Sequence, residues 1–362
     1  MPRCKIAVIQ GDGVGPEIVP EALRALNTLQ ELHSGLEFEF LDVAVGAGKY
    51  KETGVDLSRD QLETCSGADA ILKGPIGLPE IRYDDGTEVG IHIELMLRFQ
   101  LELYANLRPI FLQEGVQSRL REKKPGEINY LIVRENTEGL YLAHMSGIRR
   151  NDLAIDPLVM TERGVKRIAK FAFELAGNTP GSPSDGRRRV TCVDKSNVLR
   201  SYAFFREKFD EVAKDYPNIE RQYMYVDAMT QYMLFSPEKL NVIVTENFIG
   251  DILSDLGSAT VGGLGLAGSA NLGDDVALFE AVHGSAPDIA GKGIANPIAI
   301  LFATSHMLEW LKQAQAANTL RKAIGKVLAE GKVRTPDLGG SSSTKQVGES
   351  ISNAMKEASS RG

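Results

Sequence analysis

The sequence predicts an α/β protein in which strands and helices alternate and the strands pair mostly in parallel. Residues 5–10 form an apolar run of strand length, a glycine turn follows, and residues 16–32 carry apolar side chains at helical spacing. The same reasoning predicts the following further elements: strands at 38–45, 68–72, 128–133, 190–193 and 241–244, and a long helix at 162–176. The length of 362 residues suggests two domains or one large one.

Composition and charge exclude several classes of protein. The chain has 48 acidic and 41 basic residues, a formal charge of −7, so broad binding to nucleic acid is not expected. No apolar run is long enough to span a bilayer, and the best one, 297–308, is short and interrupted. Cys4, Cys65 and Cys192 are far apart, which argues against a disulfide framework. We expect a cytoplasmic protein with no nucleic-acid or membrane partner.

A glycine-rich turn, GDGVGP at 11–16, follows the first strand and resembles a dinucleotide-binding loop at first sight. The Rossmann fingerprint GxGxxG requires a third glycine at position 16, where this chain has Pro16. Proline suits the first turn of a helix but not the close packing that this glycine allows. The motif therefore predicts a tight strand-to-helix turn near a cleft.

Two aspartates, Asp251 and Asp255, stand four residues apart in NFIGDILSDL, so a helix would place both on one face. Such a pair disfavours the helix unless a cation lies between them, and Mg²⁺ or Mn²⁺ prefers carboxylate oxygens. Asp227, after a short strand, is a candidate third ligand. A solvated helix face is the alternative for DxxxD alone.

Three arginines, Arg98, Arg108 and Arg134, are candidates for binding a di- or tricarboxylate, because a guanidinium binds carboxylates with two hydrogen bonds. Ion pairs with Glu102 or Glu135 are the structural alternative. Tyr141 and Lys195 have no signature of their own, although a lysine near a metal and arginines can act as a general base. The turn-rich segment 177–189 ends in three arginines, which we interpret as a solvated loop rather than an anion-binding patch.

Taken together, these segments resemble the β-decarboxylating dehydrogenases, the family of 3-isopropylmalate, isocitrate, homoisocitrate and tartrate/D-malate dehydrogenases. The similarity runs from about residue 6 to 311. It consists of GDGVGPE (11–17), YANLRP (104–109), VRENTEGLY (133–141), VDKSNV (193–198), VDAM (226–229), GDILSDL (250–256) and EAVHGSAPDIAGKGIANP (280–297), in that order.

The resemblance implies an isopropylmalate dehydrogenase-like fold, with two parallel or mixed-sheet α/β domains around a cleft, and not a Rossmann fold. The chain would pass between the domains near residues 100 and 250. Residues 1–100 with 252–362 would form a large domain on the cofactor side. Residues 101–251 would form a small domain with the dimer interface and the substrate and metal residues, and 142–156 would form an arm at that interface.

The resemblance also implies roles for the candidate residues. Arg98, Arg108 and Arg134 would hold the carboxylates of a malate-type substrate, and Asp227, Asp251 and Asp255 would bind Mg²⁺ or Mn²⁺. Lys195 would take the hydroxyl proton, and Tyr141 would take part in protonating C3. The enzyme would be a homodimer or larger, with Lys195 and Asp227 donated across the interface.

A cofactor loop at 283–296 is implied in the same way. Its candidate contacts are His283, Gly284, Ser285, Ala286, Asp288 and Asn296, with Gly291 and Gly293 permitting close approach. A carboxylate at Asp288 would bond the ribose hydroxyls and repel a 2′-phosphate, which favours NAD.

The substrate is left open between two interpretations. The segment before Arg98 reads EVGIHIELML, with Glu94 and Leu95 where isopropylmalate enzymes have two leucines. A negative Glu94 would repel a third carboxylate. His92 and Glu94 together suggest a polar, non-carboxylate substituent or none, as in D-malate or tartrate. Alternatively, Glu94 faces solvent and Leu95 lines an isopropylmalate pocket. Isocitrate or homoisocitrate dehydrogenase, a non-catalytic regulatory subunit and a metal-free hydroxy-acid dehydrogenase are further alternatives.

Overall fold

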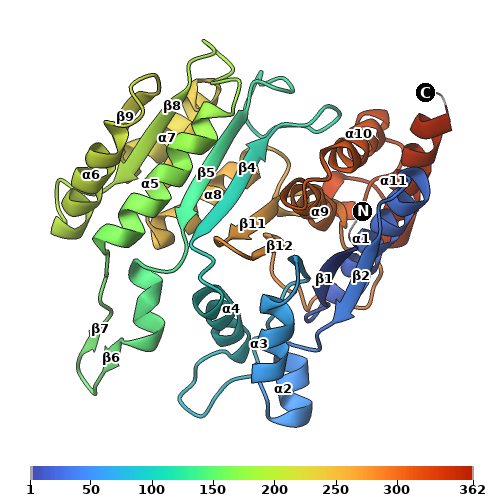
Figure 1. The fold of residues 1–362 in the computed structure, drawn as a ribbon, viewed down its shortest axis with the longest axis horizontal. Coiled ribbons are helices and arrows are strands. Elements are labelled where there is room, and N and C mark those ends of the chain that lie inside the picture. Colours follow the sequence, from blue (N-terminus) through green and yellow to red (C-terminus); the bar gives the residue numbers. More distant parts are fainter. Residues whose placement is uncertain (1–2, 361–362) are drawn as a thin grey trace. The chain divides into compact units, whose positions relative to one another are not determined.

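The computed structural model describes residues 3–360, and the chain forms two compact units (Figure 1). Unit 1 consists of Met1–Leu103, Gln113–Gln117 and Gly262–Gly362. Unit 2 consists of Tyr104–Leu112 and Ser118–Val261. Within the described residues, no helix is both long and apolar enough to cross a membrane.

Unit 1 is built on five strands in the order β2-β1-β3-β12-β11. Their bounds are β1 Cys4–Ile9, β2 Phe38–Asp42, β3 Ala70–Lys73, β11 Gly268–Leu272 and β12 Ala277–Ala281. The first four in this order run parallel, and β11 is antiparallel to β12. The strand pairing places Glu280 of β12 directly opposite Lys73 of β3. Two oppositely charged residues are thus fixed side by side in buried strands.

Helices cover both faces of this sheet. One group consists of α1 Gly15–Leu32, α9 Ile298–Trp310, α10 Ala314–Glu330 and α11 Thr344–Ser360, which pack on one another (Figure 1). The other consists of α2 Ala47–Thr53, α3 Arg59–Ser66 and α4 Val89–Gln100, and two short 3-10 helices, η3 Leu264–Leu266 and η4 Pro336–Leu338, complete the unit.

Helix α4 is positioned by an apolar stripe along one side. Val89, Ile93 and Leu97, each four residues apart, are fully buried against β-strand side chains of the core. Glu94 and Arg98 each follow one residue later, so they lie together at the edge of this stripe. The packing of α4 therefore sets the direction of both charged side chains.

Unit 2 contains a second set of five strands in the order β4-β5-β10-β8-β9. Their bounds are β4 Ala105–Phe111, β5 Asn129–Glu135, β8 Arg189–Asp194, β9 Glu220–Tyr225 and β10 Val242–Thr245. β4 is antiparallel to β5, and the other pairs are parallel. A separate hairpin of β6 Ile148–Arg149 and β7 Ala154–Ile155 lies in the segment for which an arm is predicted.

Four helices flank the strands of unit 2. α5 Glu162–Gly177 and α6 Arg200–Ala213 pack together, and α7 Val226–Phe235 and α8 Asn247–Thr260 form a second pair (Figure 1). Two short 3-10 helices, η1 Leu140–Met145 and η2 Pro237–Lys239, complete the unit. Glu246 caps α8 by accepting hydrogen bonds from the amides of Phe248 and Ile249 at 3.0 and 3.2 Å. This cap fixes the start of the helix that carries Asp251 and Asp255.

A glycine allows α8 to lie unusually close to β5. A Cβ built on Gly250 would stand only 2.6 Å from Cγ of Arg134 on β5. No side chain fits in that space without moving Arg134. Gly250 therefore brings the next residue, Asp251, within reach of the Arg134 guanidinium.

Most predicted elements of the first half are confirmed, including the strand at 5–10, the helix at 16–32 and the long helix at 162–176. The interpretation of the arginines ending 177–189 as solvated is wrong for one of them. Arg189 begins β8, is 6% exposed, and pairs with Asp185 at 2.8 Å and with Glu220 at 3.2 Å. Its backbone is in the strand ladder, so its side chain is drawn inside and paired.

Glu135, at the end of β5, is expected to make the stability of the fold depend on pH. It is 3% exposed, and burial raises the pKa of its carboxyl to about 7, although Thr137 and the Glu138 amide donate hydrogen bonds to it. Because the folded state favours the protonated form, this stabilising contribution is full below the unfolded pKa of 4.5 and is lost as pH rises through about 7.

Glu135→Gln is therefore expected to lose less stability than the wild type between about pH 5 and about pH 8. The rise in the pKa of Glu135 from 4.5 to about 7 corresponds to a loss of about 3 kcal/mol in the free energy of unfolding of the wild type over this pH range. Urea unfolding at several pH values measures the difference. Parallel stability curves for the two proteins would contradict it.

Candidate active site

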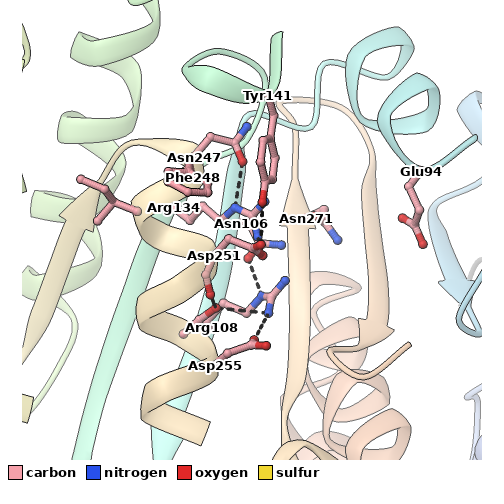
Figure 2. A network of polar contacts seen from close by, with 12 residues as sticks. Glu94, Asn106, Arg108, Arg134, Tyr141, Asn247, Phe248, Asp251, Asp255 and Asn271 are labelled. Carbon is pink, nitrogen blue, oxygen red and sulfur yellow. Dashed lines mark hydrogen bonds and ion pairs between the residues drawn. The ribbon is translucent and has the colours of Figure 1, made fainter. Parts of the chain in front are cut away.

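Two buried arginines and two aspartates form a polar network in unit 2 (Figure 2). Arg134, at the end of β5, is 1% exposed, and its Nε donates to Oδ1 of Asn247 at 2.9 Å while its Nη1 pairs with Asp251. Arg108 of β4 is 6% exposed, and its Nε donates to Oδ1 of Asn106 at 2.7 Å. Both guanidiniums are thus held in fixed orientations by side-chain amides, as carboxylate-binding groups need to be.

Asp251 and Asp255 lie one turn apart on α8, as the spacing predicts, and face the two arginines. Oδ1 of Asp255 lies 3.9 Å from Nη1 of Arg108. The pKa of Asp255 is raised by burial and by the charge of Asp251, despite the opposing effect of Arg108. Two carboxylates that disfavour each other's charge are a donor set that a divalent cation would stabilise.

Tyr141 joins the same network from η1. Its hydroxyl donates to Oδ2 of Asp251 at 2.7 Å, and the Arg134 guanidinium lies 5.4 Å from its ring centroid. The phenol therefore lies beside both a carboxylate and a cation. Such a setting suits a group that donates a proton during a reaction.

Lys195 and Asp227 form a separate pair in unit 2, with Nζ 2.5 Å from Oδ1. Lys195 follows Asp194, which is fully buried and bound by both Nε and Nη2 of Arg206 at 2.8 and 2.9 Å. These two hydrogen bonds to the guanidinium fix the end of β8, from which Lys195 projects. Within residues 3–360, no three His, Cys, Asp or Glu side chains gather as potential metal ligands, so one chain does not bring Asp227 to Asp251 and Asp255.

In unit 1, Arg98 lies beside two acids instead of the suggested Glu102 or Glu135. Its Nη2 is 3.9 Å from Glu94 and 3.7 Å from Glu280, and its buried Nε has no hydrogen-bond partner among residues 3–360. Glu94 does not face solvent as the alternative interpretation has it: its side chain is 17% exposed and lies 2.5 Å from Nζ of Lys73. The neighbouring Leu95 is 6% exposed.

Lys73 and Glu280 are charged residues that the sequence analysis missed. Burial acts to lower the pKa of Lys73, but Glu280 and Glu94 outweigh it and the pKa is raised. Burial acts to raise the pKa of Glu280, but Lys73 and Arg98 outweigh it and the pKa is lowered. Both groups are therefore held in their charged forms. The sequence did contain a signal that could have identified them. Each is the only charged residue of an otherwise apolar strand, Lys73 in AILK and Glu280 in ALFEA.

The loop after β12 contains the predicted cofactor residues, all in unit 1. Ala286, Gly291 and Gly293 have positive φ values of 43°, 78° and 64°. Asp288 is exposed, whereas Ser285 is buried. A Cβ built on Gly284, Gly291 or Gly293 would meet no atom of the described residues within 4 Å, so packing in that part of the chain does not account for these glycines.

Two other side chains of this loop are held more firmly. Burial lowers the pKa of His283, which favours its neutral form, and its Nδ1 lies 2.9 Å from the Gly284 carbonyl. Asn296 donates to Asp337 at 2.9 Å and accepts from the Ile298 amide at 3.0 Å, at the start of α9. Asn296 therefore has a structural role, whatever else it contacts.

The N-terminal glycine turn is used for packing against this same loop. Val14 donates its amide to the Ser285 carbonyl at 2.8 Å, and a Cβ on Gly13 would lie 1.9 Å from that oxygen. Asp12, which the sequence analysis did not single out, accepts from the amides of Ala47, Gly48 and Gly77 at 2.8 to 2.9 Å. The glycines here are thus explained by close backbone contacts within unit 1.

Comparison with known proteins agrees with the resemblance seen in the sequence. The family model described as "Isocitrate/isopropylmalate dehydrogenase" matches residues 5–351. The chain is 42% identical over 354 residues to a protein of Methanocaldococcus jannaschii named 3-isopropylmalate/3-methylmalate dehydrogenase, covering 98% of this chain and 99% of that one. It is also 42% identical over 360 residues to the homoisocitrate dehydrogenase of the same organism, covering 98% of each.

Among solved structures, the isocitrate dehydrogenase of Methylococcus capsulatus superposes with a TM-score of 0.86 at 36% identity. That alignment covers 98% of this chain and 99% of the other. The predicted fold is confirmed by this likeness, and the match extends over both units. The chain belongs to the isocitrate/isopropylmalate dehydrogenase family.

Proposed function

We propose that the protein oxidises and decarboxylates a malate-type 2-hydroxy acid to a 2-oxo acid and CO₂, using NAD⁺ and Mg²⁺ or Mn²⁺. The observation that carries this proposal is the network of Arg108, Arg134, Tyr141, Asp251 and Asp255 in unit 2 (Figure 2). The two arginines are fixed cations that can bind substrate carboxylates. Asp251 and Asp255, one turn apart on α8, can bind a hard divalent cation. The membership of the family supports the same reaction class.

The divalent cation would be held by Asp251 and Asp255, with Asp227 of the partner subunit as a third ligand. When bound, NAD⁺ would accept the hydride from C2, and the cation would polarise the ketone and stabilise the charge left when CO₂ departs. Arg108 and Arg134 orient the substrate carboxylates. Lys195 takes the proton of the C2 hydroxyl, and Tyr141 delivers a proton to C3 after decarboxylation.

The loop at 283–296 supports NAD as the cofactor. Its open glycines, Gly284, Gly291 and Gly293, would let a dinucleotide lie directly against the backbone. His283, Ser285, Ala286 and Asn296 would line the same site. The exposed Asp288 carboxylate would bond the adenosine ribose and disfavour a 2′-phosphate.

A homodimer is the assembly that completes the site. Lys195 and Asp227 pair with each other in one chain and not with Asp251 and Asp255, as residues donated to a second copy would do. Unit 2 also exposes large apolar side chains that suit an interface, among them Val198 at 67%, Phe235 at 77% and Ile252 at 50%. The free, buried Cys65 and Cys192 suit a reducing compartment such as the cytoplasm.

A substrate panel tests this function. Isopropylmalate, isocitrate, homoisocitrate, D-malate and tartrate are each supplied with NAD⁺ and Mn²⁺, and NADH and CO₂ are measured. We expect at least one to give equal amounts of both products, and EDTA to abolish them. NADH formation that survives EDTA without CO₂ would instead favour a plain hydroxy-acid dehydrogenase, and a silent panel would favour a regulatory subunit.

A further inference from the structure

Glu246, the residue before α8, has a buried carboxylate that accepts four hydrogen bonds from the described residues. It is 1% exposed. Its Oε1 accepts from the amide of Leu140 at 2.8 Å and from the amide of Phe248 at 3.0 Å. Its Oε2 accepts from the hydroxyl of Tyr202 at 2.9 Å and from the amide of Ile249 at 3.2 Å. With two donors on each oxygen, the carboxylate is held in one orientation.

The bond from Leu140 connects α8 to η1. Leu140 is the first residue of η1, and the next residue is Tyr141. Gly139 lies so close to Glu246 that a Cβ there would stand 2.3 Å from Oε1, and its φ is 78°. A side chain at this position would push the carboxylate away from the Leu140 amide. Gly139 therefore allows the bond between Glu246 and η1.

The next residue of α8, Asn247, makes a second connection to the same segment. Its Nδ2 donates to the carbonyl of Glu138 at 3.1 Å, while its Oδ1 accepts from Nε of Arg134 at 2.9 Å. Two consecutive residues at the start of α8 thus hold residues 138–140. Of the two, Glu246 binds the residue directly before Tyr141.

The two elements that Glu246 joins carry side chains that meet in the polar network of unit 2. The Tyr141 hydroxyl of η1 donates to Oδ2 of Asp251 on α8 at 2.7 Å (Figure 2). A short 3-10 helix has weak internal hydrogen bonds, so its position depends on how its ends are attached. A displacement of about 1 Å of a reacting group can lower a rate by about 100-fold. The attachment of η1 therefore affects whether Tyr141 is correctly placed.

We propose that Glu246 is a positioning residue that fixes Tyr141 against Asp251 by holding the start of η1 to the start of α8. This inference rests on the proposed function, in which Tyr141 delivers a proton to C3. Glu246 is buried, and its carboxylate is occupied by donors of unit 2. It therefore acts through Tyr141 and not on the substrate.

Glu246→Asp separates the capping of α8 from the connection to η1. Aspartate is a favoured N-cap residue, so it keeps hydrogen bonds to the first amides of α8. Its side chain is one methylene shorter and no longer reaches Leu140. We expect kcat to fall by about 10- to 100-fold. The affinity for Mn²⁺, measured by electron paramagnetic resonance, should not change, because Asp251 and Asp255 remain on a capped helix.

Glu246→Gln is the conservative variant that keeps the length of the side chain. Its carbonyl oxygen can take the place of Oε1 and accept from Leu140, and its NH₂ group can donate to the Tyr202 hydroxyl, which can turn to accept. It loses the bond from Ile249, so we expect lower stability but a kcat close to that of the wild type. Equal losses of kcat in the two variants would assign the effect to the cap or the charge of Glu246 and overturn the inference.

A double-mutant cycle shows whether Glu246 acts through Tyr141. In a Tyr141→Phe background, Glu246→Asp is expected to cause no further loss of kcat, because the hydroxyl that it positions is already absent. Losses that multiply would overturn the inference, since they would show that the two residues act independently.

Hydrogen–deuterium exchange followed by mass spectrometry tests the same connection without an activity assay. Peptides that cover 140–145 are expected to exchange faster in Glu246→Asp than in the wild type, because the Leu140 amide has lost its acceptor. Peptides from α8 should be unchanged. Ser58→Ala, which removes the N-cap of α3 in unit 1, is the matched control. It should lower stability in urea without changing kcat or the exchange of 140–145.

The outcomes distinguish the inference from the proposed function. Unchanged kcat and unchanged exchange of 140–145 in Glu246→Asp would overturn the inference and leave the proposed function intact. If no malate-type acid gives NADH and CO₂ with metal, the proposed function fails, whereas faster exchange of 140–145 in Glu246→Asp would still support the connection between η1 and α8.

Discussion

Replacing Lys195 with methionine is expected to lower kcat by about 10²- to 10⁴-fold, the contribution typical of a general base. Methionine keeps the length of the side chain but cannot accept the proton of the C2 hydroxyl. Cofactor binding should be nearly unchanged, because Lys195 is not among the contacts predicted for the cofactor loop at 283–296. Single-turnover assays measure the first effect, and fluorescence titration with NADH measures the second.

Lys214→Met provides a matched control, since Lys214 is an exposed lysine of the same unit. It should retain wild-type turnover. Near-wild-type turnover in Lys195→Met would exclude Lys195 as the base, whereas a parallel loss of NADH binding would point to a structural defect. The pair of variants therefore separates proton transfer from folding.

Replacing Asp251 with asparagine is expected to lower metal-dependent turnover by at least about 100-fold, because Lewis-acid stabilisation is worth several kcal/mol. Asparagine has nearly the same shape but removes one of the two charges on α8 that would bind the cation. It also weakens the contacts to Arg134 and Tyr141, which both use this carboxylate. Mn²⁺ titration followed by electron paramagnetic resonance should show weaker binding.

Asp215→Asn is the corresponding control, an exposed aspartate of unit 2 that follows α6. Partial recovery of Asp251→Asn at high Mn²⁺ would agree with a lost ligand. Unchanged Mn²⁺ affinity together with unchanged turnover would remove Asp251 from the proposed metal site.

The sequence predicted well those features that depend on short segments. The spacing of Asp251 and Asp255 sufficed to place them on one helix face, and alternation of apolar and polar residues located the long helices. Pro16 correctly indicated the start of a helix, and the structure explains Gly13 by its contact with Ser285.

Features that depend on distant pairing were not predicted. The partners of Arg98 could not be found, because Glu280 reaches it only through the pairing of β12 with β3. The buried position of Glu94 on α4 likewise depends on Lys73, which lies on β3. Strand order brings such charges together, and local periodicity contains no information about strand order.

The order of synthesis gives the strand β12 a particular importance. β3 with Lys73 is made early, yet its neighbour β12 with Glu280 emerges from the ribosome only after the whole of unit 2. Until then unit 1 has an open sheet edge, and Lys73 lacks Glu280, one of its two acid partners. Unit 2, by contrast, is nearly continuous in sequence and is free to fold first. We therefore expect the nascent N-terminal segment to need protection from aggregation until β12 arrives.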